Sequence, residues 1–395
     1  MRIVFLCGSL EPGRDGVGDY TRLLAAECIR QGHECRLLAL NDCGEGGAET
    51  QENEGVLVEC LRCPSSMPWK QRMVWARKFL EAYDPDWVSY QFVPYGYHPK
   101  GVVWRLAGDL ETLIGGRPLQ IMFHELWIGF GPAAPLKQRI VGALQRHCIF
   151  RMIRKLKPRA VHTSNATYVG LLKRGGIVAT ELPLFGNIPI HPIGPEPVLP
   201  AQLVAAGVPA DPAGRNGWWL ALFFGTLHHE WSPHPLTDIL LRAAKRAGKR
   251  LCMISAGRLG ASGEALWEKM RLEIGQEMVF VKCGEQSCEE ISALLQMADF
   301  GVAVTPWELM GKSGSAAAML DHGLPILFTR DNTGAAALAE GGLLTDPLFH
   351  RCDGTLEAKL IAGLQRRQPT PRVREICAGF IAALSVSSRP APNAL

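Results

Sequence analysis

The chain has 395 residues, of which 47% are hydrophobic and 20% are charged, and its formal net charge is +4. This length is sufficient for two domains of ordinary size, and so small a net charge argues against a nucleic-acid-binding protein. The sequence has no apolar run of about 20 residues, which a membrane-spanning helix would need. Its first residues do not resemble a secretory signal, so we expect a cytoplasmic enzyme.

Twelve cysteines are scattered along the chain without a regular set of spacings. Cys60 and Cys63 form the one C-x-x-C pair, and no second pair follows at the spacing of a zinc site. We therefore expect reduced, mostly buried thiols and no bound metal, with a zinc site at this pair as the alternative.

The first half of the chain alternates short apolar runs with helical periodicity. An apolar run at 2–7 leads into a glycine-rich loop, a helix from about Thr21 to Gln31, and a second run at 35–40. This order predicts a βαβ unit and a parallel sheet. Further strands are expected at 87–92, 119–123 and 160–163, with a helix at 69–83. Residues 1–186 are thus predicted to form a first Rossmann-like domain.

A proline-rich stretch then interrupts this alternation. Eight prolines fall within 183–212, so we interpret 187–217 as a linker region with one short helix near 201–206. Strands follow at 218–224, 250–255, 278–282 and 300–304, with helices at 236–247 and 288–297. The prediction is an α/β protein with a second Rossmann-like domain at 218–370 and a C-terminal helix and tail at 371–395.

Doubly wound sheets bind ligands at the carboxyl ends of their strands. Polar or glycine-rich loops are expected at these ends in both halves, facing one cleft: 8–19, 123–127, 225–231, 256–260 and 306–315. The last loop carries Glu308 and Lys312, followed by Ser313, Gly314 and Ser315 before an alanine-rich helix predicted at 316–320. Unpaired N–H groups and the dipole at a helix start favour an anion there. The alternative is that both serines are N-caps without function.

Other loops give less specific signals. The GRDGVG run does not match G-x-G-x-x-G, so a nicotinamide cofactor is not expected. His124 ends a strand, where it can orient a ligand or move a proton, or it is a structural histidine. The spacing of His228, His229 and His234 matches no zinc pattern, and a hydrogen bond from His228 to a phosphate or sugar is the preferred interpretation.

Four segments together resemble family 4 glycosyltransferases of the GT-B fold: GVGDYTRLLA, FHE, FGTL, and ADFGVAVTPWE with HGLPIL. The resemblance extends from Met1 to about Thr329. It implies two Rossmann-like domains with a nucleotide-diphospho-sugar in the cleft between them. It further implies transfer with retention of configuration without a metal or other cofactor, and a C-terminal helix, here within 371–384, that crosses back to the first domain.

The resemblance also implies roles for single residues. Gly16 and Gly18 match the loop near the diphosphate and acceptor, and His124 matches the histidine that touches the donor sugar. Glu308 matches the first glutamate of an E-x7-E element, which meets the sugar. Gly225 and Thr226 follow the FG strand near the diphosphate. Asp19 is a candidate for holding an acceptor hydroxyl, or it is a helix N-cap.

The sequence departs from the family pattern at several of its charged positions. Aligned from Gly323 and Pro325, the two glutamates of E-x7-E fall on Met310 and Ala318, which places Glu308 two residues out of register. The arginine and lysine that clamp the diphosphate fall on Thr226 and Trp231. Lys312, Arg258 and the N–H groups at 313–315 could supply the missing positive charge. We favour an active, divergent transferase; the alternatives are a catalytically silent nucleotide-sugar-binding protein and an epimerase-like enzyme.

A basic stretch at 137–159 is predicted to be helical, with apolar residues between its arginines and lysines. It could contact the inner membrane face peripherally, or it could pack one face on its own sheet and solvate the other. The expected partners are therefore a nucleotide-sugar donor and a glycan, lipid or small-molecule acceptor whose identity the sequence leaves open.

Overall fold

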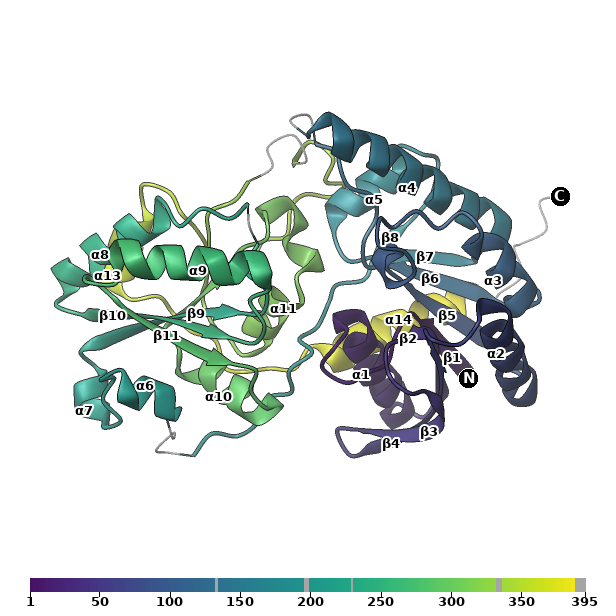
Figure 1. Ribbon diagram of the computed structural model, residues 1–395, viewed down its shortest axis with the longest axis horizontal. Coiled ribbons are helices and arrows are strands. Elements are labelled where there is room, and N and C mark those ends of the chain that lie inside the picture. Colours follow the sequence, from purple (N-terminus) through teal and green to yellow (C-terminus); the bar gives the residue numbers. More distant parts are fainter. Residues whose placement is uncertain (132–133, 195–198, 229, 332–335, 388–395) are drawn as a thin grey trace. The chain divides into compact units, whose positions relative to one another are not determined.

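The computed structural model describes the chain except for residues 132–133, 195–198, 229, 332–335 and 388–395. The chain divides into two compact units (Figure 1). Unit 1 comprises 1–187, 332–343 and 373–395, and unit 2 comprises 188–331 and 344–372. The predicted linker region therefore lies almost entirely in unit 2, and the domain boundaries drawn from the sequence remain predictions.

Unit 1 contains an eight-stranded sheet in the order β3-β4-β2-β1-β5-β6-β7-β8, in which only the β3–β4 pair is antiparallel. Its strands are β1 (Arg2–Cys7), β2 (Glu34–Asp42), β3 (Gly47–Asn53), β4 (Val56–Pro64), β5 (Trp87–Phe92), β6 (Leu119–Phe123), β7 (Ala160–Thr163) and β8 (Thr180–Glu181). Its helices are α1 (Gly16–Arg30), α2 (Trp69–Tyr83), η1 (Pro94–Gly96), α3 (Leu106–Ile114), α4 (Leu136–Leu156), α5 (Ala166–Lys173) and α14 (Val373–Ser387).

The β3–β4 hairpin was not predicted from the sequence. Strand β3 is largely polar and exposed, so it lacks the apolar alternation that marks a strand. The hairpin turns through Glu54 and Gly55, whose φ angles of 50° and 74° fit the tight two-residue turn that matches strand twist.

Unit 2 contains a six-stranded parallel sheet in the order β11-β10-β9-β12-β13-β14. Its strands are β9 (Trp218–Phe224), β10 (Arg250–Ala256), β11 (Val279–Gly284), β12 (Phe300–Ala303), β13 (Ile326–Phe328) and β14 (Phe349–Arg351). Its helices are α6 (Ala201–Ala205), α7 (Pro212–Arg215), α8 (Leu236–Ala247), α9 (Ala261–Ile274), α10 (Cys288–Met297), η2 (Trp307–Lys312), α11 (Gly314–Asp321) and α13 (Leu356–Ala362).

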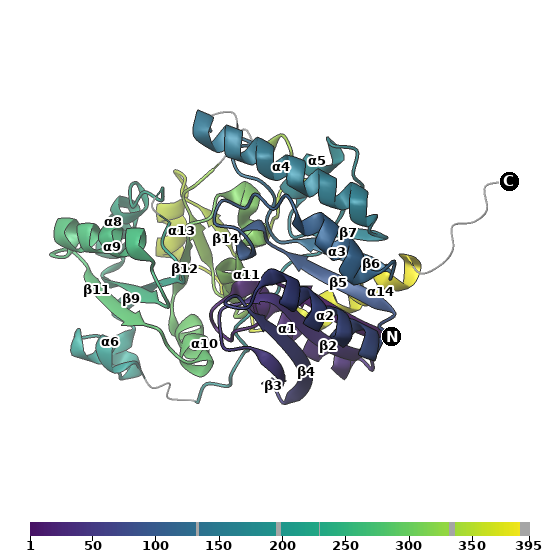
Figure 2. The same ribbon diagram turned by 45° about the vertical axis from the view of Figure 1, so that its right-hand side comes forward.

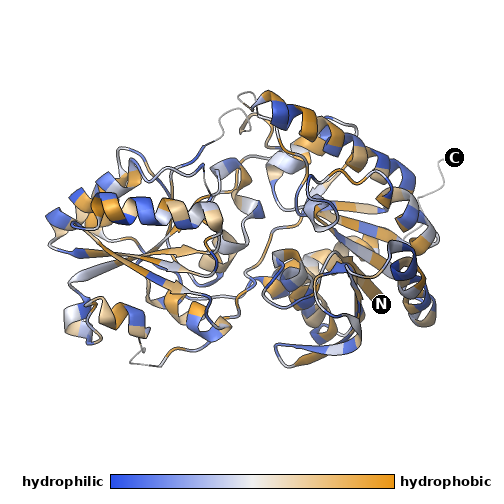
Figure 3. Cartoon of the chain, in the orientation of Figure 1, coloured by the Kyte–Doolittle hydropathy of each residue, from blue (hydrophilic) through white to orange (hydrophobic). Residues whose placement is uncertain are grey.

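Strand β9 shows how the sheet of unit 2 is buried on both faces. Leu220 and Leu222 pack into a core with α10 and α11, whereas Ala221 and Phe223 pack into a second core with α8 and α9. Because successive side chains of a strand point to opposite faces, a continuous apolar run is needed here. Figure 3 shows the strands of both sheets as mostly hydrophobic.

The segment predicted as a linker contributes to the core of unit 2. Helix α6 confirms the short helix expected there, and α7 was not predicted. Leu203 and Val208, which are 0% and 1% exposed, join the same core as β9 and β10. Described residues of this stretch therefore pack into the core of unit 2.

Helix α14 returns to unit 1 and packs against α1 (Figures 1 and 2). Its buried residues Ile376, Cys377 and Phe380 share a core with Ile3 and Phe5 of β1. Within the described part of the chain, no helix is both long and apolar enough to cross a bilayer.

Candidate functional site

The loops at the carboxyl edge of the unit 2 sheet are tied to one another. The N–H of Gly225 donates to the carbonyl oxygen of Ala256 at 2.9 Å, and the N–H of Gly257 donates to that of Gly284 at 2.7 Å. Gly225 and Gly257 have φ angles of 86° and 85°, which favour glycine. The loops after β9, β10 and β11 therefore form one continuous rim.

The anion-binding site predicted at Lys312, Ser313, Gly314 and Ser315 lies on the same edge of the unit 2 sheet. Helix α11 begins at Gly314, two residues earlier than predicted, because Ser313 caps it: its Oγ accepts from the N–H of Ala316 at 3.2 Å. Ser315 lies inside the first turn, with its Oγ 3.1 Å from that of Ser313. The N-cap interpretation thus holds for Ser313 and is wrong for Ser315, which stays only partly buried at the positive end of the helix.

The two residues aligned with the glutamates of the E-x7-E element are both buried. Met310 and Ala318 are 1% and 0% exposed and belong to the apolar core of unit 2. A carboxylate at either position would be buried among apolar side chains. Glu308 in η2 is also buried, at 4% exposed, so its contact with a donor sugar remains a proposal.

The two positions of the loop after β9 that align with the cationic clamp of family 4 differ in burial. Trp231 is 2% exposed and packs edge-on against Phe223 at 5.0 Å, so it serves the core. Thr226 and His228 are exposed, and the Nδ1 of His228 accepts from the N–H of Glu230 at 3.2 Å. His229 lies outside the described residues.

Arg258 and Arg330 lie at this edge, each next to a carboxylate. The guanidinium of Arg258 is 3.0 Å from the carboxylate of Glu285, so a diphosphate would have to compete with this ion pair. Arg330, which the sequence analysis missed, donates to Glu230 at 2.7 Å and to the carbonyl of Val304 at 3.2 Å. Its position two residues after β13 was the signal that could have identified it.

In unit 1, helix α1 begins at Gly16 rather than at the predicted Thr21. The cap is Asp15, whose Oδ1 accepts from the N–H of Val17 at 3.0 Å, so the alternative of Asp19 as the N-cap is wrong. Asp19 lies in the first turn, where it accepts from the N–H of Gly13 at 3.0 Å and from Arg22 at 3.1 Å. Burial raises the pKa of Asp15 above its usual value. Two carboxylates at this helix start suit a hydroxyl group better than a phosphate.

The two glycines of this turn differ in their surroundings. Gly18 is buried, and a Cβ built on it would lie 2.4 Å from the carbonyl oxygen of Ser9. Gly16 is exposed, and a Cβ there would meet nothing within 4 Å. Gly18 is thus required by the close approach of α1 to the loop after β1, whatever its role toward a ligand.

His124, one residue beyond β6, is buried with 6% exposure. Its Nε2 lies 2.9 Å from the Oε1 of Gln91, and its ring meets that of Tyr20 edge-on at 5.0 Å. Burial lowers the pKa of His124 to about 3. The imidazole is therefore neutral near pH 7, which favours the orienting role over the proton-transfer role.

A buried chain of hydrogen bonds continues from His124 across three strands. Gln91 Nε2 donates to Ser89 Oγ at 2.8 Å, Ser89 donates to Gln120 Oε1 at 2.6 Å, and Gln120 Nε2 lies 3.0 Å from His162 Nδ1. The Nε2 of Gln91 donates to Ser89, so the Oε1 of Gln91 faces His124. Because an amide oxygen can only accept a hydrogen bond, the Nε2 of His124 must carry the proton and donate it to Gln91. Ser89 and Gln91, two residues apart on β5, and Gln120 on β6 interrupt apolar runs; this was visible in the sequence and was overlooked.

A metal site receives no support from the cysteine pair. Cys60 and Cys63 lie three residues apart on β4, so their side chains point to opposite faces of the sheet. Among the residues that the structure describes, no three histidine, cysteine or acidic side chains are grouped as metal ligands would be.

No protein-family model matches the chain, and no curated protein matches it. Solved structures do resemble it. HepE of Anabaena in complex with UDP and glucose is 14% identical with a TM-score of 0.54, covering 98% of this chain and 100% of that one. The catalytic domain of starch synthase IV from Arabidopsis thaliana, bound to ADP and acarbose, is 10% identical with a TM-score of 0.58 at the same coverage.

A third similar structure is the UDP-GlcNAc 2-epimerase of Methanocaldococcus jannaschii, 9% identical with a TM-score of 0.50 over 98% of this chain and 100% of that one. At such identities the likeness concerns the fold. The chain therefore has the GT-B fold of two Rossmann-like domains, as predicted, and this fold is shared by glycosyltransferases and epimerases.

Proposed function

We propose that this chain is a glycosyltransferase that moves a sugar from a nucleotide-diphospho-sugar to an acceptor hydroxyl. The finer proposal is a divergent member of family 4 that retains configuration and needs no metal. One observation carries it: a lysine and two serines at the start of α11, on the ligand-binding edge of a GT-B sheet.

The proposal assigns the donor to unit 2. Lys312 and the N–H groups of Gly314 and Ser315 bind the diphosphate, and Glu308 meets the sugar. The N–H of Ser313, which the sequence also offered, instead donates to the carbonyl oxygen of Met310 at 2.9 Å. Gly225 allows close approach of the donor to the rim, while Thr226 and His228 offer hydrogen bonds to it. Arg258 joins the diphosphate by exchanging its carboxylate partner Glu285 for a phosphate. No ribose carboxylate is assigned, because Ala318 lies in the core.

The proposal assigns sugar positioning and the acceptor to unit 1. With Nε2–H donated to Gln91, the Nδ1 lone pair of His124 remains to accept a sugar hydroxyl. Asp19, held by Gly13 and Arg22, accepts the hydroxyl of the acceptor, next to Gly16 and Gly18. As the sugar–oxygen bond breaks, the leaving diphosphate gains charge that Lys312 and the helix start stabilise, and a donor phosphate oxygen takes the acceptor's proton.

The test is donor binding to Lys312→Ala, measured by calorimetry with UDP, ADP, GDP and their glucose conjugates. Loss of one charge-assisted contact is expected to weaken diphosphate binding about 10–100-fold. Lys269→Ala, an exposed lysine on α9, is the matched control and is expected to bind as wild type does. Equal affinity of Lys312→Ala and wild type would remove the diphosphate role of this lysine.

The same panel separates the rival functions. A wild-type chain that binds none of these nucleotides, or binds one without turnover, supports the catalytically silent relative. The epimerase neighbour motivates the other alternative. Conversion of the donor sugar when no acceptor is present would favour an epimerase-like enzyme, whereas consumption of the donor only with an acceptor present supports transfer.

A further inference from the structure

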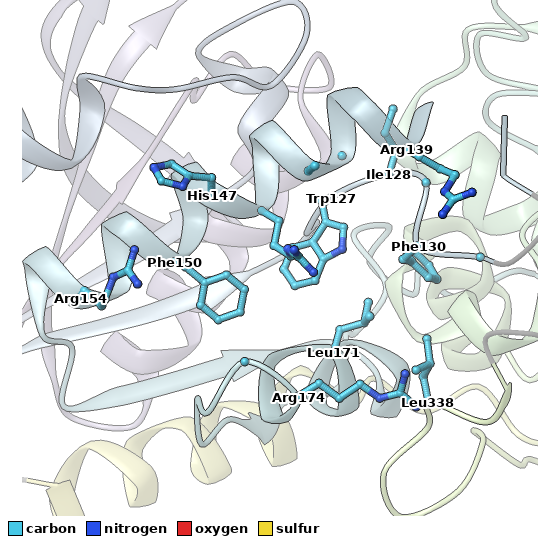
Figure 4. Close-up of a pocket in the computed structure, with 16 residues that line it drawn as sticks. Trp127, Ile128, Phe130, Arg139, His147, Phe150, Arg154, Leu171, Arg174 and Leu338 are labelled. Atoms are coloured by element: carbon cyan, nitrogen blue, oxygen red, sulfur yellow. The ribbon is translucent and has the colours of Figure 1, made fainter. Parts of the chain in front are cut away.

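Unit 1 carries a groove of about 820 Å³ that the proposed donor chemistry does not use (Figure 4). It begins at Trp127, three residues after His124, and lies between α4 and α5. Its apolar lining consists mainly of Trp127, Ile128, Phe130, Phe150, Leu171 and Leu338. Its volume lies within the range of small-molecule sites.

One face of α4 forms the wall of the groove. Arg139, Ala143, Arg146, Phe150 and Arg154 recur at three- and four-residue spacing and all line it. The opposite face of α4 is buried against unit 1 through Gln145, Cys148, Ile149, Met152 and Ile153. The basic stretch noted in the sequence thus packs one face on its own unit, as one of the two interpretations predicted, and directs a row of arginines along the groove.

The groove is built by close backbone contacts. A Cβ on Gly142 would lie 1.8 Å from the carbonyl oxygen of Ile128, so the loop that carries Trp127 rests directly on α4. A Cβ on Gly170 would lie 1.7 Å from the carbonyl oxygen of Leu338, so the segment carrying Leu338 rests directly on α5. Only glycine permits these approaches, and together they set the width of the groove.

The floor and the walls differ in chemistry. The rings of Trp127 and Phe150 lie 5.8 Å apart, and Figure 4 shows both toward the middle of the cavity. Leu171 and Leu338 are buried at 8% and 7% exposure. The floor is therefore an aromatic and aliphatic surface that an alkyl chain would cover.

The walls carry uncompensated positive charge. Arg139, Arg146, Arg154 and Arg174 all line the groove, and no aspartate or glutamate is among its described lining residues. In the part of the chain that the structure describes, none of these four guanidinium groups has a carboxylate within ion-pair distance. Two nearby lysines are neutralised, since Lys155 pairs with Glu111 and Lys173 pairs with Glu340.

We infer that this groove binds an anionic amphiphile, a phosphate monoester of a long alkyl or polyprenyl-type chain. The arginines match the geometry and charge of the phosphate, and the floor takes the first part of the chain. Leu136, Ile140 and Leu144, exposed at 71%, 56% and 40% on the neighbouring strip of α4, extend the apolar surface for a longer chain. A free sugar phosphate would leave this apolar surface without a partner.

If the proposed transferase function holds, the amphiphile carries the acceptor hydroxyl, and this last step rests on that function. The binding site itself does not depend on it. Its test therefore uses no donor nucleotide. If the amphiphile does not bind, the proposed donor site is unaffected, and if the donor does not bind, the proposed amphiphile site is unaffected.

The experiment is calorimetric titration of the full chain with dodecyl phosphate below its micelle concentration. One molecule is expected to bind per chain. Inorganic phosphate lacks the alkyl chain and dodecyl maltoside lacks the phosphate, so each is expected to bind about 10–100-fold more weakly. The double substitution Arg146→Gln with Arg174→Gln is expected to weaken the binding of dodecyl phosphate by a similar factor. Arg77→Gln, an exposed arginine of α2, is the charge control.

A steric variant tests the location. Ala143→Trp fills the groove from an exposed position and is expected to abolish binding, whereas Ala82→Trp, also exposed and helical, should leave it unchanged. Both variants should melt near the wild-type temperature. Any one of four results would overturn the inference: dodecyl maltoside binds as tightly as dodecyl phosphate, inorganic phosphate does so, the arginine double variant keeps wild-type affinity, or Ala143→Trp keeps it.

Discussion

The side chains around His124 determine its protonation state and its tautomer. Its position after a strand suggested orientation or proton transfer, and its burial beside Tyr20 and Gln91 decides between them. A ring whose pKa is lowered to about 3 stays neutral at physiological pH. The hydrogen-bond chain through Ser89 and Gln120 then sets which ring nitrogen carries the proton.

The buried histidines make stability depend on pH. Burial lowers the pKa of His124 to about 3 and that of His162 to about 4, from 6.5 in both cases. Below pH 6.5 the unfolded chain therefore binds protons that the folded chain does not, so the unfolding free energy falls as the pH falls. At pH 5 each histidine accounts for at most about 2 kcal/mol of this loss.

This is measured by urea unfolding at pH 7.5 and pH 5. His162→Gln has its own cost at pH 7.5, because it disturbs the bond to Gln120, but it should lose up to about 2 kcal/mol less than wild type between the two pH values. An identical loss in wild type and His162→Gln would contradict the assignment of His162 as a neutral, buried group.

At the scale of one element, the start of α1 shows how capping sets a boundary. The capping side chain of Asp15 begins the helix five residues before the predicted start, within a run whose three glycines suggested a loop. Gly18 is there because the helix touches the backbone of Ser9, and Gly16 has open space around it.

These two glycines give a matched pair of substitutions. Gly18→Ala is expected to destabilise the chain by about 1–3 kcal/mol, because its Cβ would collide with backbone that cannot move aside. Gly16→Ala should be neutral or stabilise by up to about 1 kcal/mol, since alanine favours the helix. Urea unfolding of both variants is the measurement, and equal effects would refute the packing role of Gly18.

At the scale of the whole molecule, the chain returns to its starting unit. The segment 373–387 follows unit 2 in sequence and forms α14, which packs on α1. Phe380 is fully buried, and its ring lies 5.6 Å from that of Phe5 on β1. The core of unit 1 is therefore completed by residues from a helix near the other end of the printed sequence.

Phe380→Ala tests this closure. Loss of a buried ring is expected to cost about 3–5 kcal/mol, and the loss should be felt in unit 1. Amide hydrogen exchange is expected to speed up in β1 and α1 much more than in β9 of unit 2. Val386→Ala, a residue 72% exposed on the same helix, is the control. Unchanged exchange in β1 would mean that α14 contributes little to this core.

Much of the architecture could be predicted without the structure. The predicted bounds of β5, β6, β9, α2, α8 and α10 agree with the observed ones, because long apolar runs and helical periodicity are local properties of the chain. The anion site proposed at the start of α11 could be predicted for the same reason, since Lys312 and the two serines are neighbours in sequence.

What remained hidden depends on packing between distant segments. Strand β3 is polar, so only its pairing with β4 identifies it as a strand. Within the proline-rich stretch, only contacts with the core of unit 2 show that Leu203 and Val208 are buried. Trp231 and Ala318 align with ligand-binding positions of the family, yet both side chains are buried in the cores of unit 2. A local sequence pattern can assign a residue to a helix or strand. Segments that only the folded chain brings together decide which way its side chain faces and how far its pKa shifts. They also decide which arginines border one groove.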